Sequence, residues 1–228
     1  MRGHDVFVLH SLHGDASESG NDKLCRLLFF CGALKDAGAE RVTMVTPYLC
    51  YARKGQRTKP NDPVITRYVA AMFEAVRVDR LIALEVHNIA AFENAFRCPT
   101  WHIDSAPLFA AHFAPILRGE QVVVVSPDAG GAKRAERCRQ ALELLTRDAV
   151  GGAIKEKYRS GGEVRGALLA GDVRGKVAVI VDDLISTGGT LVRAATSCRA
   201  AGGDESVRCR GARTVHWCGH RVVRHAGD

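Results

Sequence analysis

The segment Lys176-Val-Ala-Val-Ile-Val-Asp-Asp-Leu-Ile-Ser-Thr-Gly-Gly-Thr190 carries the clearest structural signal in this chain. Its first part, 177–181, is an unbroken apolar and mostly β-branched run, which is typical of a strand buried on both faces of a parallel sheet. Two adjacent acids, Asp182 and Asp183, stand where this strand is expected to end. The small residues that follow predict a loop that opens a helix near Leu191.

This loop has the composition of a site for a phosphorylated sugar. Its backbone N–H groups and the start of the helix would hold a phosphate, helped by about half a positive charge from the helix dipole. Asp182 and Asp183 would accept hydrogen bonds from sugar hydroxyls. The alternative is an ordinary strand-to-helix turn beside a solvated acidic pair. The sugar-phosphate site is favoured because acids, hydroxyls and glycines occur in the order that this chemistry requires.

Length and charge narrow the class of protein. The chain has 228 residues, enough for one large or two small domains, and a net charge of +7. The basic residues do not form one run and no nucleic-acid-binding motif is present, so we expect an anionic polyphosphate substrate and no nucleic-acid partner. No apolar run of about 20 residues could span a bilayer, and the start is too short and polar for a signal peptide. We therefore expect a cytoplasmic protein without a membrane partner.

Apolar runs and helical patterns alternate along the chain and predict an α/β fold. Strands are expected at 5–9, 41–45, 81–86, 122–125 and 177–181. Helices are expected from Asn21 or Asp22 to Gly38, after Pro63, at 106–117, at 131–145 and after Gly189. This alternation predicts parallel sheets with helices on both faces, and a break near Arg118 and Gly119 divides it into two halves.

Two of these helices have a clear apolar face. The first presents Leu24, Leu27, Leu28, Cys31 and Leu34 at helical spacing. The second, with Pro63 in its first turn, presents Ile65, Val69, Met72 and Val76. We expect both faces to be buried.

The loop after 177–181 resembles the phosphoribosyl-pyrophosphate (PRPP) binding loop of phosphoribosyltransferases and PRPP synthetases. Four further segments are similar to PRPP synthetases, in family order: Thr46-Pro-Tyr-Leu-Cys-Tyr-Ala-Arg53, Glu85-Val-His87, Ser126-Pro-Asp-Ala-Gly-Gly131 and Ala153-Ile-Lys-Glu-Lys-Tyr-Arg159. The last of these resembles the flexible-loop segment of the family. A phosphoribosyltransferase has no reason to carry the other four. From about Arg2 to Gly202 the chain therefore resembles ribose-phosphate diphosphokinase, the PRPP synthetase family.

The resemblance implies two phosphoribosyltransferase-like domains, at 1–118 and 119–202, followed by an irregular segment at 203–228. It implies transfer of the β,γ-diphosphate of ATP to the C1 hydroxyl of ribose 5-phosphate, which yields PRPP and AMP for nucleotide biosynthesis. ATP and ribose 5-phosphate are the implied substrates and Mg²⁺ the implied cofactor. The family also implies a homo-oligomer, either a dimer or a hexamer.

The resemblance also assigns roles to individual residues. Lys157 and Arg159 would close over the transferring group as catalytic residues, and Arg53 would contact the ATP phosphates. His87 and Asp128 would reach the magnesium ion; a carboxylate suits Mg²⁺, whereas His87 rests on the resemblance alone. The expected ligands of ribose 5-phosphate are Asp182, Asp183, Ser186, Thr187, Gly188, Gly189 and Thr190.

Each of these residues also has a purely structural interpretation. His87, at a strand end, suits a core histidine that donates to a backbone carbonyl. Lys157 and Arg159 suit a solvated charge run, and Arg53 suits plain surface charge. Asp128, before two glycines, suits a turn aspartate. The ordered set of motifs favours the functional roles.

The chain departs from the family pattern at several points. Family members carry a further stretch before the position of Arg2, with an element that contacts adenine, so either the start is misplaced or the nucleotide site is incomplete. After Arg53 the chain reads Lys-Gly-Gln-Arg instead of Gln-Asp-Arg-Lys, and Ser186 replaces a common Asp. The periodic pattern stops after Gly202. Our hypothesis is that residues from about Gly203 are an out-of-frame product, which would leave the strand at 177–181 near an open sheet edge.

Two other functions stay open. A phosphoribosyltransferase would consume PRPP and is disfavoured by the segments at 126–131 and 153–159. A non-catalytic subunit that binds an active synthetase is favoured by the missing N-terminal element and the irregular C-terminal segment.

Overall fold

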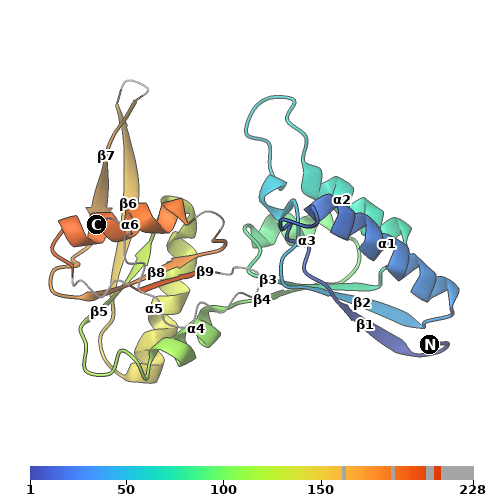
Figure 1. Cartoon of the computed structure of the whole chain (residues 1–228), viewed down its shortest axis with the longest axis horizontal. Helices are drawn as coiled ribbons and strands as arrows, with labels where there is room; N and C mark the ends of the chain where they lie inside the picture. The colour runs from blue at the N-terminus through green and yellow to red at the C-terminus, as the bar shows by residue number, and fades with distance from the viewer. Residues whose placement is uncertain (161–162, 186–187, 204–207, 212–228) are drawn as a thin grey trace. The chain divides into compact units, whose positions relative to one another are not determined.

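The computed structural model of this chain describes residues 1–160, 163–185, 188–203 and 208–211 (Figure 1). The predicted α/β class, with parallel sheets flanked by helices, is confirmed. The chain divides into two compact units, Met1–Asp104 and Ser105–Asp228. The boundary expected near Arg118 thus falls inside the second unit, because helix α4 (Ala106–Phe113) shares an apolar core with helix α5 (Ala132–Thr146).

The first unit is a four-stranded parallel sheet with its helices packed against it. The strands cross the sheet in chain order: β1 (Asp5–Leu9), β2 (Arg41–Thr46), β3 (Arg80–Leu84) and β4 (Thr100–Ile103). The helical segments are α1 (Gly20–Asp36), the 3-10 turn η1 (Ala52–Lys54), α2 (Ile65–Ala75) and α3 (Ile89–Ala95). Helix α3 and strand β4 are absent from the sequence-based prediction, because both are too short to produce a clear periodic pattern.

The N-cap of helix α1 lies two or three residues before the predicted cap. Ser19 is the N-cap, and its hydroxyl accepts the Asp22 N–H at 3.2 Å while the Asp22 carboxylate accepts the Ser19 N–H at 3.1 Å. Asp22 is therefore the third helical residue of a capping box, and the prediction of Asn21 or Asp22 as the cap was wrong. Gly38 follows the C-cap with φ +85°, as expected of a helix stop. The five predicted core residues of this helix are all buried.

Helix α2 is rotated relative to its predicted face. Its buried residues are Thr66, Val69, Ala70 and Phe73. Met72, which was expected in the core, is 40% exposed. Pro63 precedes the helix, which begins at Ile65. The error arose because Phe73 and Met72 are both apolar, and only the packing of Phe73 against Phe96 selects between the two faces.

The second unit is a mixed five-stranded sheet with helices on both faces (Figure 1). Its strand order is β7-β6-β5-β8-β9, and only β6 and β7 pair in antiparallel fashion. The strands are β5 (Val122–Ser126), β6 (Gly151–Ser160), β7 (Glu163–Ala170), β8 (Val177–Asp182) and β9 (Arg208–Gly211). Helix α6 (Gly189–Ala200) follows β8.

Successive residues of the central strands enter two different cores. Val122, Val124, Val177, Val179 and Val181 pack with α4 and α5. Val123, Val125, Ala178 and Ile180 pack with α6. The prediction that 177–181 is buried on both faces is therefore confirmed, since each of its five residues is at most 4% exposed.

Three further expectations differ from the structure. The segment 153–159 was expected to be a flexible loop, but its backbone lies in β6, paired with β7. Regular structure was expected to stop at Gly202, but β9 pairs with β8, so β8 is not an edge strand. Helix α4 ends at Phe113 and not at 117, because Pro115 cannot donate a backbone hydrogen bond. Within the described ranges, no helix is both long and apolar enough to cross a bilayer.

Candidate functional site

The second unit has a topological switch point between β5 and β8. From β5 the chain passes through α5 to β6 on one side, and from β8 it passes through α6 to β9 on the other side. Ligands of such sheets bind in the crevice beyond the carboxyl ends of the strands at this point. Asp128 follows β5, and Asp182 and Asp183 lie at the end of the neighbouring β8. The sheet therefore brings together three acids that the sequence singled out.

The turn after β5 is held by its own side chains. Ser126 Oγ donates to the carbonyl of Asp128 at 2.6 Å, and Asp128 Oδ1 accepts the Gly131 N–H at 3.0 Å. Asp128 is thus a turn aspartate, as its structural interpretation proposed, and this bond also orients its carboxylate. A Cβ on Gly131 would lie only 2.7 Å from Ser126 Oγ, so the turn requires glycine here.

The acids at the end of β8 are not a solvated pair. Asp183 is 7% exposed, and its N–H donates to Asp182 Oδ1 at 2.8 Å. Burial and, to a smaller extent, a hydrogen bond with the Asp183 side chain raise the pKa of the Asp182 carboxyl to about 6. The alternative of a simple turn beside solvated acids is therefore wrong, and the pair is a partly desolvated acceptor site.

Arg134 is a residue of this site that the sequence analysis missed. It lies in the first turn of α5 and is only 8% exposed. Its Nη1 is 3.9 Å from Asp182 Oδ1, and its Nη2 is 3.7 Å from Asp183 Oδ2. A cation in the first turn of a helix opposes the helix dipole. That unfavourable position was the available signal that Arg134 has a partner elsewhere.

The start of α6 has the backbone geometry of a phosphate-binding turn. Gly188 is the N-cap, has φ +78° and provides no capping side chain. The first N–H groups of a helix make no intrahelical bond, which leaves this end suited to an anion. Gly189 and Thr190 form the first turn, whereas the predicted ligands Ser186 and Thr187 lie outside the described residues.

Lys157 and Arg159 lie in β6 of the β6–β7 hairpin. Lys157 pairs with Ala167 and Arg159 with Val164, and the register shifts between the two pairs. Residues two apart in a regular strand share one face, but such a bulge changes the direction of the strand. Their side chains lie outside the described part of the structure, so their catalytic role stays a prediction.

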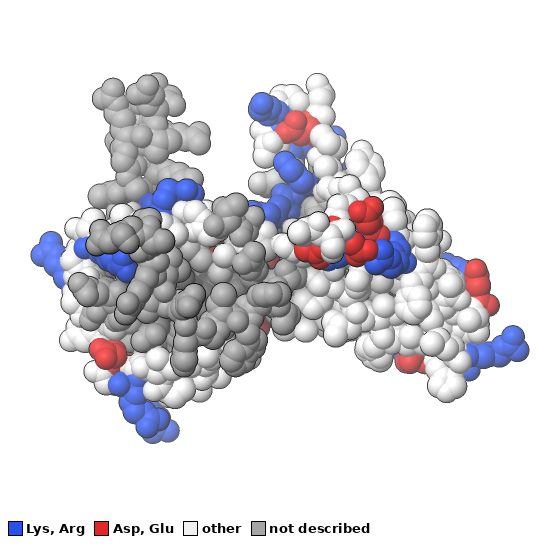
Figure 2. Space-filling view, in the orientation of Figure 1, with Lys and Arg blue, Asp and Glu red and all other residues white. Residues whose placement is uncertain are grey.

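Arg53 lies in η1 of the first unit, just beyond the carboxyl end of β2. It is exposed, as are its basic neighbours Lys54, Arg57 and Lys59. Figure 2 shows basic side chains on the loop between η1 and α2, with an acidic side chain among them. Arg53 thus belongs to an exposed basic segment, which is compatible both with plain surface charge and with binding a polyphosphate.

His87 follows β3 and directly precedes Asn88, the N-cap of α3. Its side chain is exposed, so the interpretation of His87 as a core histidine was wrong. Glu85 and Val86 of this motif are buried, each 6% exposed, and Glu85 has φ +47°. A buried non-glycine residue with positive φ is strained, and such strain is concentrated at functional sites.

Comparison with known proteins identifies the family of this chain. The profile of the N-terminal domain of ribose phosphate pyrophosphokinase matches residues 1–76, and that of the phosphoribosyl transferase domain matches residues 102–209. A ribose-phosphate pyrophosphokinase of Fusobacterium nucleatum is 35% identical over 96% of this chain and 63% of that protein. The chain belongs to the ribose-phosphate pyrophosphokinase family.

Two other members of the family show the same extent of similarity. Ribose-phosphate pyrophosphokinase 1 of Streptococcus pyogenes is 38% identical over 89% of this chain and 61% of that protein. The crystal structure of phosphoribosylpyrophosphate synthetase from Mycobacterium smegmatis superposes with a TM-score of 0.77 at 31% identity, over 89% of this chain and 62% of that one. The chain thus spans less than two thirds of the length of these ribose-phosphate pyrophosphokinases.

The carboxylate of Asp128 suits a hard divalent cation such as Mg²⁺. Within the described ranges, no three His, Cys, Asp or Glu side chains form a group that could hold a metal. Mg²⁺ needs no such group, because it is usually bound by one or two carboxylates together with water and substrate phosphates. Asp128 offers a carboxylate oriented by the Gly131 N–H, so its chemistry fits this ion.

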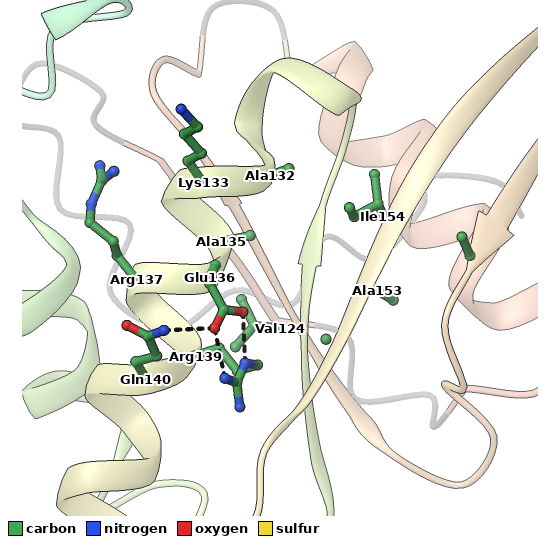
Figure 3. Close-up of a pocket in the computed structure, with 12 residues that line it drawn as sticks. Val124, Ala132, Lys133, Ala135, Glu136, Arg137, Arg139, Gln140, Ala153 and Ile154 are labelled. Carbon is green, nitrogen blue, oxygen red and sulfur yellow. Dashed lines mark hydrogen bonds and ion pairs between the residues drawn. The ribbon is translucent and has the colours of Figure 1, made fainter.

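A separate groove of about 710 Å³ lies beside α5 (Figure 3). It is lined by α5 residues such as Lys133, Arg137 and Gln140 and by β6 residues such as Ile154. Glu136 is bound in the groove by Arg139 and Gln140, as the dashed lines in Figure 3 show. None of the predicted site residues lines this groove, so we do not identify it with the family's active site.

Proposed function

We propose that this chain carries the ribose 5-phosphate and diphosphate sites of a ribose-phosphate diphosphokinase. The reaction transfers the β,γ-diphosphate of ATP to the C1 hydroxyl of ribose 5-phosphate and yields PRPP and AMP. One observation carries the proposal: the Asp128 turn and the Asp182–Asp183 pair lie at adjacent strand ends, at the switch point of the sheet. That arrangement suits a ligand with a sugar and phosphates at opposite ends.

In this proposal the sugar is held by the second unit. Asp182 and Asp183 accept hydrogen bonds from ribose hydroxyls, and their low exposure makes these bonds stronger than they would be in water. The residues from Ser186 to Thr190 hold the 5-phosphate, in part through backbone N–H groups at the start of α6. Together these contacts fix the position of the C1 hydroxyl.

The transfer requires that the two reactants are held in position and that positive charge lies near the phosphoryl oxygens. The C1 hydroxyl attacks the β-phosphorus in line with the departing AMP oxygen, and negative charge accumulates on the phosphoryl oxygens. Lys157 and Arg159 offset this charge in the transition state, and Arg53 binds the ATP phosphates. Asp128 and His87 are the proposed ligands of Mg²⁺. When bound, the ion neutralises phosphate charge and orients the diphosphate.

Two further features belong to the proposal because the family implies them. We propose a homo-oligomer, since nucleotide sites of the family are formed between chains. We also propose a cytoplasmic location, where ATP and ribose 5-phosphate are available.

The experiment is a binding and turnover assay of the whole chain. Titration with ribose 5-phosphate should show saturable binding, and Asp183→Asn should weaken it at least tenfold because a buried charge-assisted acceptor is lost. Asp172→Asn is the control, because Asp172 is exposed and precedes β8, at the end of the strand opposite to Asp182. Its carboxylate accepts the Arg174 N–H and pairs with Lys176. AMP formed from ATP only when ribose 5-phosphate and Mg²⁺ are present would establish the reaction.

The alternatives give different results in the same assay. Pyrophosphate released from PRPP and a free base would identify a phosphoribosyltransferase instead. Binding of ribose 5-phosphate without AMP release, together with tight association with a complete synthetase, would identify a non-catalytic subunit. If the wild-type chain does not bind ribose 5-phosphate, the proposed site is wrong.

A further inference from the structure

We propose that Arg134 is the positioning residue of the ribose site: its guanidinium holds Asp182 and Asp183 as a pair of oriented, ionised hydrogen-bond acceptors. The inference rests on the proposed function, because it assigns a partner within that same site. It concerns a residue that lies outside the motif at 182–190 and outside the turn at 126–131.

The geometry of Arg134 points to a shared partner for both acids. Its two terminal nitrogens lie near different carboxylates: Nη1 is 3.9 Å from Asp182 Oδ1, and Nη2 is 3.7 Å from Asp183 Oδ2. Both distances exceed a direct hydrogen bond, so the cation acts on the pair through its charge or through bridging water.

Burial makes this charge effective. The side chains of Arg134, Asp182 and Asp183 are 9%, 15% and 6% exposed, so water screens their interaction weakly. Without a cation, two adjacent buried carboxylates repel each other and one of them takes up a proton. A protonated carboxyl loses acceptor capacity toward a ribose hydroxyl.

The turn after β5 makes room for this cation. A Cβ on Gly131 would lie 3.5 Å from Arg134 Nη1 in addition to its close approach to Ser126 Oγ. Arg134 therefore passes beside the glycine that ends the Asp128 turn and reaches the end of β8. It connects the two strand ends that the proposed function assigns to the diphosphate and to the sugar.

Among the described residues, the charges that act on Asp182 are those of Asp183 and Arg134. Asp183 raises its pKa and Arg134 lowers it. On the neighbouring elements, Asp128 bonds Gly131, and Lys155 of β6 donates to the carbonyl of Arg193 in α6 at 2.8 Å. Gly211, opposite Asp182 in β9, has no ionisable side chain.

The test compares ribose 5-phosphate affinity from pH 5.5 to 9 in the wild type, Arg134→Met, Arg134→Gln and Arg134→Lys. We expect the midpoint of tight binding to move up by about one pH unit or more in the two neutral variants. With a wild-type midpoint of about 6, a shift of one unit should make their binding at pH 6.5 roughly threefold weaker, and at pH 8.5 the difference should fall to within about twofold. Arg134→Lys should restore the wild-type midpoint. Ionisation of the ligand's phosphate is common to all variants and cancels in the ratio.

Lys133→Met is the matched control, since it removes the same charge from the adjacent, exposed position of α5. Its midpoint should equal that of the wild type. If a neutral Arg134 variant loses affinity by the same factor at every pH, the role of Arg134 is merely structural and the proposal is overturned. Carboxyl ¹³C titration of ligand-free protein measures the Asp182 midpoint directly, so it tests Arg134 even if the wild type does not bind ribose 5-phosphate. If Arg134→Met does not fold, Arg134→Gln gives the same comparison.

Discussion

Asp183 donates its backbone N–H to Asp182 Oδ1 at 2.8 Å, so the two acids at the end of β8 form one hydrogen-bonded unit. Asp182 is consequently held close to a second carboxyl that is almost fully buried. The pKa of Asp182 is nevertheless raised, first by its own burial and then by its hydrogen bond with the Asp183 side chain, whereas the Asp183 backbone N–H lowers it. This relationship has a measurable effect on the stability of the fold.

Because the pKa of Asp182 is raised in the folded state, the contribution of Asp182 to the free energy of unfolding should fall as pH rises. The folded carboxyl has a pKa of about 6 against the ordinary value of 3.8, so the folded state binds more protons between these values. The stabilisation is present below pH 3.8 and is lost as pH rises through 6. From pH 5 to pH 7 the free energy of unfolding of the wild type should therefore fall by about 1 kcal/mol more than that of Asp182→Asn, as measured by urea unfolding.

Asp172→Asn is the control for this pH dependence. The Asp172 pKa is lowered by its hydrogen bond with Lys176, so its contribution is present above the ordinary pKa and is lost only at lower pH. The difference in free energy of unfolding between Asp172→Asn and the wild type should be constant from pH 5 to 7. A constant difference for Asp182→Asn as well would contradict the raised pKa.

Gly131→Ala should destabilise the second unit by about 1–3 kcal/mol. The new Cβ would meet Ser126 Oγ at 2.7 Å, and that hydroxyl is fixed by its bond to the Asp128 carbonyl. Gly152→Ala in β6 is the comparison, because its Cβ would meet only the flexible Arg139 side chain, at 3.4 Å. Chemical denaturation should separate the two variants, and equal stabilities would show that the turn adapts.

Gly188→Ala should impair α6 through backbone strain alone. Gly188 has φ +78°, and a Cβ there would meet no atom within 4 Å. The cost of this left-handed conformation for alanine is about 1–2 kcal/mol. Gly188→Asn should cost less, because asparagine adopts this conformation more readily. Thermal unfolding ranks the three proteins, and a more stable alanine variant would rule out strain at this position.

Ser19→Ala should destabilise the first unit by about 1 kcal/mol, since it removes the hydroxyl that accepts the Asp22 N–H. Ser197→Ala is a useful comparison, because the Ser197 hydroxyl bonds only the Arg193 carbonyl within its own helix. That change should stay within about 0.5 kcal/mol of the wild type. Similar losses for both serines in urea unfolding would count against the capping box.

Features that depend on local periodicity were predicted correctly. The run 177–181 was predicted as a doubly buried strand because five consecutive apolar residues satisfy both faces of a parallel sheet. The core face of α1 was predicted in full because a period of 3.6 residues identifies one side of a helix. The wrong cap and the rotated face of α2 show that neighbouring candidates such as Met72 and Phe73 are separated only by packing.

The chain's local pattern therefore established an α/β fold and the acids and glycines of the loop beyond 177–181, since strand and helix periods and turn chemistry act over a few residues. The tertiary structure established which of those elements are neighbours. Pairing of β9 with β8 and of β6 with β7 depends on partners distant in sequence. The position of Arg134 beside Asp182 and Asp183 exists only because β5 and β8 are adjacent and α5 packs across them, so that buried charges far apart in the chain stabilise one another.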